Sequence, residues 1–124
     1  MANYRLAVIP GDGIGKEVVA VGLEVLDAVA ASNGLSVATQ TLPWGCEFYR
    51  QTGRMMPEDA LERLAEHDAI FLGAIGSPGV PDHVSLWGLL IPIRRHFQQY
   101  VNLRPVRLLP GIPSPLAANP PIDF

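Results

Sequence analysis

The sequence contains one cysteine, one lysine and no long uninterrupted run of apolar residues. A single cysteine, Cys46, cannot close an intramolecular disulfide, and no CxxC or His-rich neighbourhood surrounds it to suggest a metal site. We therefore expect a reducing, cytoplasmic setting. The apolar run near the start is too short for a signal peptide, and none approaches the roughly 18 residues of a membrane span. The sequence predicts a soluble protein with no membrane partner.

Basic charge is also scarce, since the formal net charge of the 124 residues is −3. A general nucleic-acid surface needs a broad basic footprint, so the composition disfavours nucleic acid as a partner. Four of the nine basic residues nevertheless gather between residues 86 and 110, and all four are arginines: Arg94, Arg95, Arg104 and Arg107. The arginine side chain binds a carboxylate or phosphate in a bidentate manner. The cluster therefore predicts a binding site for a small anion. The alternative is that these arginines form an ordinary solvent-exposed surface.

Two short segments, residues 5–10 and 69–73, are apolar on both faces, which is typical of strands buried in a parallel sheet. Valines recur at helical spacing through residues 18–29, and residues 35–42 have the composition of another strand. Strands that alternate with helices predict an α/β fold with a mostly parallel sheet and flanking helices. In such a sheet, ligands bind beyond the carboxyl ends of the strands.

Weaker patterns follow the second predicted strand. A short helix over residues 45–52 and another from Pro57 to near His67 are expected. A further helix is predicted to begin near Pro92, with Ile93, Phe97 and Tyr100 on one apolar stripe.

Residues 101–109 are predicted as a strand that returns along this last helix, which would bring Arg94 and Arg104 to one place. We expect residues 1–109 to form an amino-terminal α/β segment. Residues 110–124 are expected to form a proline-rich connector that leads to further structure absent from this chain.

The glycine loop at residues 11–15 fits neither common phosphate-binding motif. A Walker loop needs serine or threonine where Glu17 stands, and a dinucleotide fingerprint needs GxGxxG rather than GDGIG. The second predicted strand also lacks a terminal acid for a ribose. A tight structural turn is the alternative interpretation, and the residues alone indicate no nucleophile, base or metal constellation.

Three segments together carry a family resemblance: VIPGDGIGKEV, AIFLGAIGSP and LLIPIRRHFQQYVNLRP. The sequence resembles the metal-dependent β-decarboxylating dehydrogenases, which act on isopropylmalate, isocitrate, tartrate or D-malate. The segments DHVSLWG and QYVNLRPVRLLPG are most similar to the tartrate and D-malate branch. The resemblance implies an isopropylmalate dehydrogenase-like fold, incomplete in this chain, with NAD bound at a non-Rossmann site.

The resemblance also implies roles for particular residues. Arg94 and Arg104 match two arginines that bind substrate carboxylates. The residues that match a cofactor-lining segment are Ile14, Ile75, Gly76, Ser77, Pro78 and Gly79. The stretch near the variable substrate side group is matched by Trp87, Gly88, Leu89 and Leu90. Its Trp-Gly pair disfavours a branched-alkyl substrate, and Leu90 offers no polar partner for a third carboxylate.

The implied reaction is the NAD-dependent oxidation and decarboxylation of a malate-like 2-hydroxy acid, assisted by Mg or Mn, in a homodimer. In the family the metal ligands and the proton-transfer tyrosine and lysine lie beyond the segment that corresponds to residue 124. We therefore expect no catalytic or metal-binding residue within this chain. The alternatives are a fragment of an isopropylmalate or isocitrate dehydrogenase, or a stand-alone anion- or nucleotide-binding module without catalysis.

Overall fold

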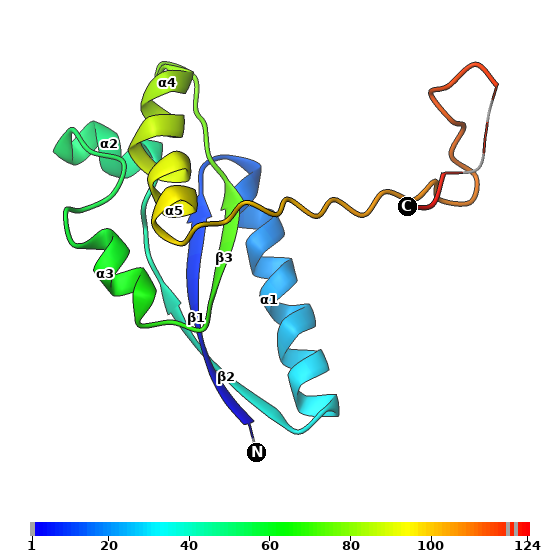
Figure 1. Cartoon of the computed structure of the whole chain (residues 1–124), viewed down its shortest axis with the longest axis horizontal. Helices are drawn as coiled ribbons and strands as arrows, with labels where there is room; N and C mark the ends of the chain where they lie inside the picture. The colour runs from blue at the N-terminus through cyan, green and yellow to red at the C-terminus, as the bar shows by residue number, and fades with distance from the viewer. Residues whose placement is uncertain (1, 119, 121) are drawn as a thin grey trace.

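The structure is a computed structural model that describes residues 2–118, 120 and 122–124 (Figure 1). Its centre is a three-stranded sheet in the order β2-β1-β3, built from β1 (Ala2–Gly11), β2 (Leu35–Thr41) and β3 (Ala69–Ala74). Strand β1 pairs with both neighbours in parallel. The predicted α/β fold with a parallel sheet is confirmed.

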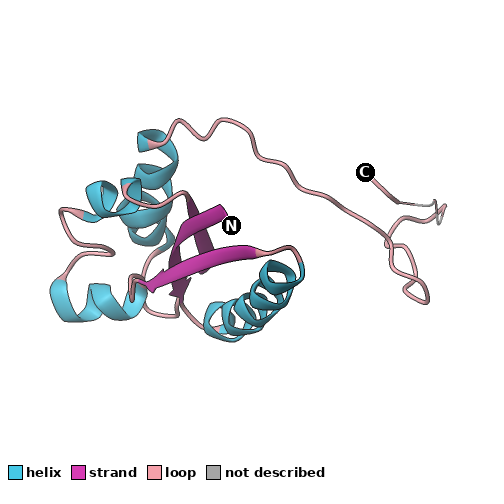
Figure 2. Ribbon diagram, turned by 90° about the horizontal axis from the view of Figure 1, so that it is seen from below, coloured by secondary structure: helices cyan, strands magenta, loops and turns pink. Residues whose placement is uncertain are grey.

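The two faces of the sheet are covered by different helices (Figures 1 and 2). Helix α1 (Ile14–Ser32) crosses one face, where its Gly22 lies close to the ring of Phe71 on β3. The other helices cover the opposite face, where Ala7 and Ile9 of β1 join the main hydrophobic core. Since successive side chains of a strand point to opposite faces, the fully buried Val8 lies under α1.

Short helices build the main core on the second face: α2 (Cys46–Thr52), α3 (Ala60–Ala65) and a helical segment that runs from α4 (Asp82–Ser85) through η1 (Leu86–Leu90) into α5 (Ile91–His96). The largest fully buried side chains of this core, besides those of the strands, are Leu42, Cys46, Leu64 and Leu89. The short helix α2, whose sequence signal was weak, is confirmed, and α3 lies within the predicted range.

The helix predicted to begin near Pro92 begins ten residues earlier, at Asp82. Proline inside a helix normally clashes with the carbonyl four residues before it. Here a π-helical turn, η1, immediately precedes Pro92, and the Ile91 amide donates to the Leu86 carbonyl. This wider turn gives the proline ring room, because π-turns open the helix locally.

The strand predicted over residues 101–109 is wrong. After α5 the chain leaves the body of the fold rather than returning along the helix (Figures 1 and 2). Only Arg107 forms an isolated antiparallel bridge, with Asp123, supported by backbone hydrogen bonds between Val106 and Phe124. Tyr100 lies beyond the helix and is 92% exposed, so it does not belong to an apolar stripe. A β-prone run forms a strand only where a partner strand is available.

Helix α1 keeps an apolar face in solvent. Its exposed valines, Val18, Val21, Val25 and Val29, are each between 51% and 60% exposed. They follow one another at helical spacing on the side turned away from the sheet. Among the described residues, no helix is long and apolar enough to cross a membrane.

Candidate functional site

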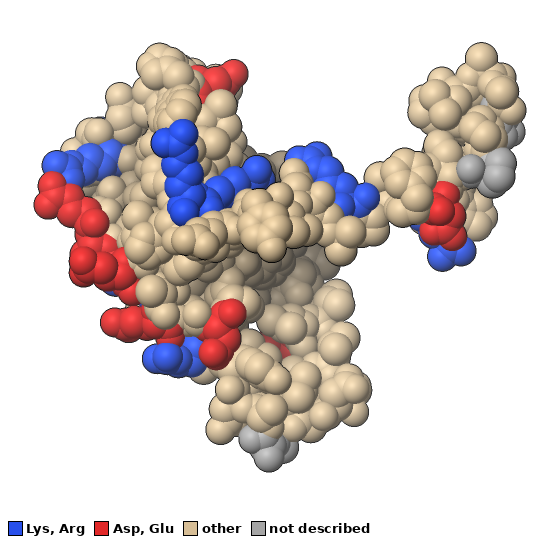
Figure 3. All heavy atoms as spheres, in the orientation of Figure 1, with Lys and Arg blue, Asp and Glu red and all other residues tan. Residues whose placement is uncertain are grey.

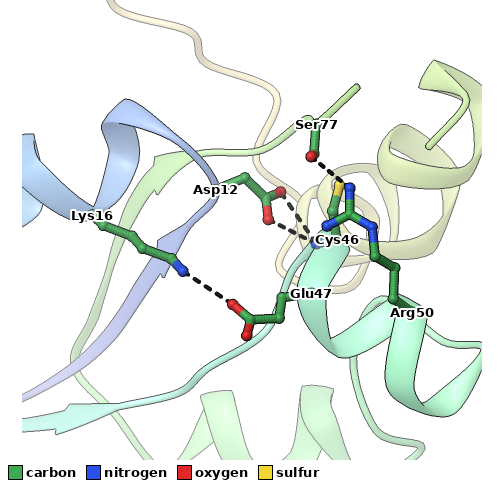
Figure 4. Close-up of polar contacts among 6 residues, drawn as sticks. All are labelled: Asp12, Lys16, Cys46, Glu47, Arg50 and Ser77. Atoms are coloured by element: carbon green, nitrogen blue, oxygen red, sulfur yellow. Dashed lines mark hydrogen bonds and ion pairs between the residues drawn. The ribbon is translucent and has the colours of Figure 1, made fainter. Parts of the chain in front are cut away.

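Three loops meet at the carboxyl end of the parallel sheet, and Asp12 joins them. Asp12 follows β1, and its carboxylate Oδ1 accepts a hydrogen bond from the Cys46 amide at 2.9 Å, at the start of α2. Its Oδ2 accepts from the Gly76 amide at 3.0 Å, in the loop after β3. The Asp12 amide donates to the Ala74 carbonyl at 2.7 Å. One side chain therefore fixes the ends of all three loops relative to one another (Figure 4).

The surroundings of Asp12 are shaped to receive its carboxylate. Asp12 is only 6% exposed, and a side chain at Gly45 would come within 3.1 Å of Oδ1. Gly45 also has a φ of 146°, a backbone conformation that favours glycine. In the described part of the chain, none of the ion pairs involves Asp12. Its charge is stabilised by backbone N–H groups, which bind a carboxylate strongly.

Two side-chain contacts connect α2 to the neighbouring loops (Figure 4). Arg50 donates from Nη2 to Ser77 Oγ at 2.7 Å and to the Pro78 carbonyl at 3.1 Å. Lys16, in the first turns of α1, forms an ion pair with Glu47 at 3.1 Å. The Lys16 pair is largely exposed and therefore contributes little stability. The Arg50 hydrogen bonds are also exposed, and they connect α2 to the loop predicted to line a cofactor.

A cleft of about 360 Å³ lies beside this cluster, between the glycine loop and α2. It is lined by Pro10, Gly11, Asp12, Lys16, Thr41, Pro43, Trp44, Gly45, Glu47, Phe48 and Gln51. Its one basic group, Lys16, is already paired with Glu47. The cleft therefore has apolar surface for a ligand to contact, but its lysine is not free to bind an anionic ligand.

The thiol of Cys46 is completely buried next to Asp12. Burial in apolar surroundings, followed by the hydrogen bond and negative charge of Asp12, raises the pKa of Cys46 to about 11. A thiolate is the reactive form of cysteine, so this side chain is a poor nucleophile at neutral pH. Cys46 is a packing residue at this edge of the sheet.

This raised pKa predicts an alkaline loss of stability. Below pH 9.0, the ordinary pKa of the thiol, Cys46 is protonated in both the folded and the unfolded chain and has no effect. Between pH 9.0 and about 11 only the unfolded chain loses the proton, so the free energy of unfolding falls, by roughly 2 to 3 kcal/mol in total. Urea unfolding of wild type and Cys46→Ala across this range measures the difference. Parallel pH profiles for the two proteins would contradict the assignment.

The two arginines predicted to bind one substrate are not brought together by the described contacts. Arg94 lies in the last turn of α5 and lines a shallow depression with Trp87, Ile91 and Tyr100. Arg104 lies in the segment beyond the helix, and its Nε donates to Asn102 Oδ1 at 3.4 Å. Basic side chains gather along α5 and the segment that follows it (Figure 3). Their role in substrate binding stays a prediction.

The other arginines of the cluster have local partners. Arg95 stacks over the Trp87 ring, with its guanidinium carbon 5.1 Å from the ring centroid. Arg107 lies 3.7 Å from the Asp123 carboxylate, in an exposed ion pair. Arg95 is therefore more than a surface charge, because it holds the indole of Trp87 in place.

The four residues predicted to lie near the substrate side group differ in accessibility. Trp87 is 59% exposed, whereas Leu89 is completely buried in the main core. Leu90 is partly buried against the same core. A side chain at Gly88 would come within 2.6 Å of Met55, so Gly88 permits close packing of the helix. Among the four, Trp87 is the residue whose side chain is free to meet a ligand.

The residues predicted to line a dinucleotide lie at the same end of the sheet as Asp12. Ile14 opens α1 with a side chain that is 65% exposed, and the loop after β3 contains Gly76 and Gly79, both with positive φ. A Cβ at either glycine would meet nothing within 4 Å, so the loop backbone is open to a neighbouring molecule. Apolar contacts and backbone groups of this kind fit a dinucleotide bound without an acid at the end of β2.

The comparison with known proteins decides the family. The sequence profile described as isocitrate/isopropylmalate dehydrogenase matches residues 5–123. The chain belongs to this family.

Curated members of the family share about half of their residues with the chain. The D-malate dehydrogenase (decarboxylating) of Escherichia coli is 54% identical over the whole chain, and a probable tartrate dehydrogenase/decarboxylase of Agrobacterium vitis is 52% identical. The chain spans 36% and 35% of these two proteins, respectively, which is about a third of their length.

A solved structure within the family has the same fold. The β-decarboxylating dehydrogenase of Thermococcus kodakarensis, in its apo form, superposes with a TM-score of 0.68 at 33% identity, covering 84% of this chain and 30% of that one. The predicted isopropylmalate dehydrogenase-like fold is confirmed, and the chain corresponds to only part of such a molecule.

The family implies a divalent metal. Among the described residues, no group of three or more His, Cys, Asp or Glu side chains lies close enough together to hold an ion. The buried carboxylate of Asp12 is engaged by backbone amides. The described residues therefore do not form a metal site by themselves.

Sequence reasoning missed two residues of this site, Asp12 and Arg50. Asp12 stands between two glycines after a buried strand, a position that is also typical of a tight turn. Arg50 has the sequence context of an ordinary surface charge on a short helix. Only the fold shows that both side chains reach the loop at residues 75–79.

Proposed function

We propose that this chain forms part of the substrate and NAD sites of an oxidative decarboxylase that acts on a malate-like 2-hydroxy acid such as D-malate or tartrate. One observation carries the proposal: relatives named D-malate dehydrogenase and tartrate dehydrogenase/decarboxylase align over the whole chain at 54% and 52% identity. The proposed enzyme is longer than this chain, acts as a homodimer, and uses Mg or Mn held by residues that this chain does not contain.

In this proposal Arg94 and Arg104 bind the carboxylates of the hydroxy acid. Each guanidinium offers a planar set of donors that matches a carboxylate and holds it in one orientation. Arg94 lies on α5, whereas Arg104 lies in a segment that is neither helix nor strand. Bound substrate carboxylates would supply the attraction that brings Arg104 to Arg94.

Trp87 is proposed to border the space for the substituent that distinguishes one hydroxy acid from another. Its large, half-exposed indole, held by Arg95, fills space that a branched alkyl substituent would need. This arrangement favours the smaller substituents of D-malate and tartrate over that of isopropylmalate.

The loop at residues 75–79 and Ile14 are proposed to contact NAD. When bound, NAD supplies the hydride acceptor for oxidation of the 2-hydroxyl group. The chain contributes an apolar contact from Ile14 and an open glycine-containing backbone that lets the dinucleotide approach closely. Arg50 and Asp12 hold that backbone in place before the ligand binds.

The proposal is tested in a joined protein, in which this chain is followed by the part of the Escherichia coli D-malate dehydrogenase that lies beyond the matched segment. NADH formation is measured with D-malate, tartrate, isopropylmalate and isocitrate, each with Mg or Mn. We expect the highest kcat/KM with D-malate or tartrate. A preference for isopropylmalate or isocitrate would contradict the substrate assignment.

The 124-residue chain by itself is expected to form no NADH with any of these substrates. The physical reason is that the described residues contain no metal-holding cluster, so the alkoxide and enolate that oxidation and decarboxylation generate lack stabilisation. The same NADH assay with the purified chain, compared with a buffer blank, measures this. Turnover above the blank would show that the chain carries a complete site and would support an independent catalytic module.

A further inference from the structure

Asp12 and Arg50 attach the loop at residues 75–79 to α2 through two separate links. The first runs from the Cys46 amide through the Asp12 carboxylate to the Gly76 amide. The second runs from the Arg50 guanidinium to Ser77 Oγ and the Pro78 carbonyl. The two links begin one helical turn apart on α2 and end on adjacent residues of the loop. Figure 4 shows the Asp12–Cys46 contact of the first link and the Arg50–Ser77 contact of the second.

These contacts are not what packing alone would require. Burying a carboxylate costs free energy unless hydrogen bonds from the protein replace those it made with water. For the buried Asp12 carboxylate, these bonds come from the Cys46 and Gly76 amides, which lie in two different loops. Such a carboxylate holds both loops in one relative position, because losing either amide would leave it poorly solvated.

Apart from these links, the loop is restrained at its start by Ile75, whose partly buried side chain packs against the main core. Gly76 and Gly79 adopt positive φ, and each is in open space on the side where a Cβ would be. Val80 provides the next anchor, where its side chain is buried and its amide donates to the Ser77 carbonyl at 3.1 Å. Between Ala74 and Val80 the links to Asp12 and Arg50 therefore restrain a backbone that glycine would otherwise leave free to vary.

We propose that Asp12 and Arg50 are positioning residues that preorganise the 75–79 loop for its dinucleotide ligand, with α2 as the rigid support. This inference rests on the proposed function, because it is that proposal that assigns NAD to the loop. Preorganisation raises affinity by removing the cost of ordering the loop when the ligand binds. Neither side chain is required to touch the reacting atoms.

Amide hydrogen exchange of the 124-residue chain tests the restraint without any ligand. Asp12→Asn and Arg50→Ala are each expected to accelerate exchange of the Gly76 and Val80 amides, which donate to the Asp12 carboxylate and the Ser77 carbonyl, by roughly severalfold to tenfold. Exchange in the centres of α1 and β1 is expected to stay unchanged, which separates local release of the loop from unfolding.

Two matched variants serve as controls. Arg54→Ala removes the same side chain four residues further on, where Arg54 pairs with Glu58 in solvent. Asp68→Asn changes a carboxylate that accepts a backbone hydrogen bond from Arg5, at the opposite end of the sheet. Neither control is expected to alter exchange in the loop. Unchanged loop exchange in every one of the two variants that folds would overturn the proposal.

The joined protein provides the functional readout. There the two variants are expected to raise KM for NAD by roughly fivefold to tenfold and to leave KM for the hydroxy acid unchanged, with Arg50→Lys restoring part of the loss. If the variants accelerate loop exchange but leave KM for NAD unchanged, the loop does not contribute to dinucleotide binding as proposed. If the joined wild type does not use NAD at all, the proposed function fails, while the exchange measurement still decides whether Asp12 and Arg50 hold the loop.

Discussion

Replacing Arg94 or Arg104 with alanine in the joined protein is expected to lower kcat/KM for the 2-hydroxy acid roughly tenfold to a few hundredfold. Each change leaves a substrate carboxylate without its charge-assisted hydrogen bonds, which are worth about 1.5 to 3 kcal/mol per contact. Lysine at either position is expected to recover only part of the loss, because a compact ammonium group cannot form the bidentate pair. Steady-state kinetics with D-malate and tartrate at saturating NAD and metal measure the effect.

Arg107→Ala is the matched control for these variants. Arg107 pairs with Asp123 in solvent, and an exposed pair of this kind is expected to change binding by less than about 1 kcal/mol. Arg95 is unsuitable as a control because its guanidinium stacks on Trp87, beside the proposed substrate. Equal small losses at Arg94, Arg104 and Arg107 would show that neither Arg94 nor Arg104 binds a substrate carboxylate.

A large loss of stability is expected from Gly73→Ala or Gly15→Ala. A Cβ at Gly73 would lie 2.2 Å from the Pro10 carbonyl oxygen and 2.9 Å from Val19 Cγ2, and one at Gly15 would lie 2.3 Å from the same oxygen. These neighbours are the backbone of a buried strand and a buried helix residue, so they cannot yield without moving α1 off the sheet. We expect a loss on the order of 3 kcal/mol or more, which is a large fraction of a small domain's stability.

Gly34→Ala is the control that separates the effect of this steric clash on stability from the effect of replacing any glycine with alanine. Gly34 has a φ of +64°, but a Cβ added there would meet open space, so only backbone strain of about 1 to 2 kcal/mol is expected. Urea unfolding followed by circular dichroism compares the three variants with wild type. A Gly73→Ala protein as stable as Gly34→Ala would show that β3 and α1 do not pack as closely as described.

The buried strands and α1 were predictable because their side-chain patterns report burial directly. Residues 5–10 and 69–73 are apolar on both faces, and they form the paired strands β1 and β3. The start of the long helical segment at Asp82 was missed because Pro92 resembles a first helical position. Its accommodation by the π-helical turn depends on hydrogen bonding that composition does not reveal.

The candidate site was predictable only through the family resemblance. The motif residues Ile14 and 75–79 do lie at one end of the sheet, as that resemblance implies, but their contact with NAD stays a prediction. The strand proposed for residues 101–109 failed because its partner is absent from the described fold, and the expected meeting of Arg94 with Arg104 failed with it. Asp12 and Arg50 could be recognised only in the folded chain, because the loops they join are far apart in sequence.

The central claim, that this chain belongs to the active site of an oxidative decarboxylase, is tested most directly by measuring NADH and carbon dioxide together in the joined protein. With D-malate or tartrate as substrate, we expect one carbon dioxide released for each NADH formed, complete loss of both with a chelator, and recovery on adding Mg or Mn. NADH formation without carbon dioxide, or turnover that survives the chelator, would contradict the claim.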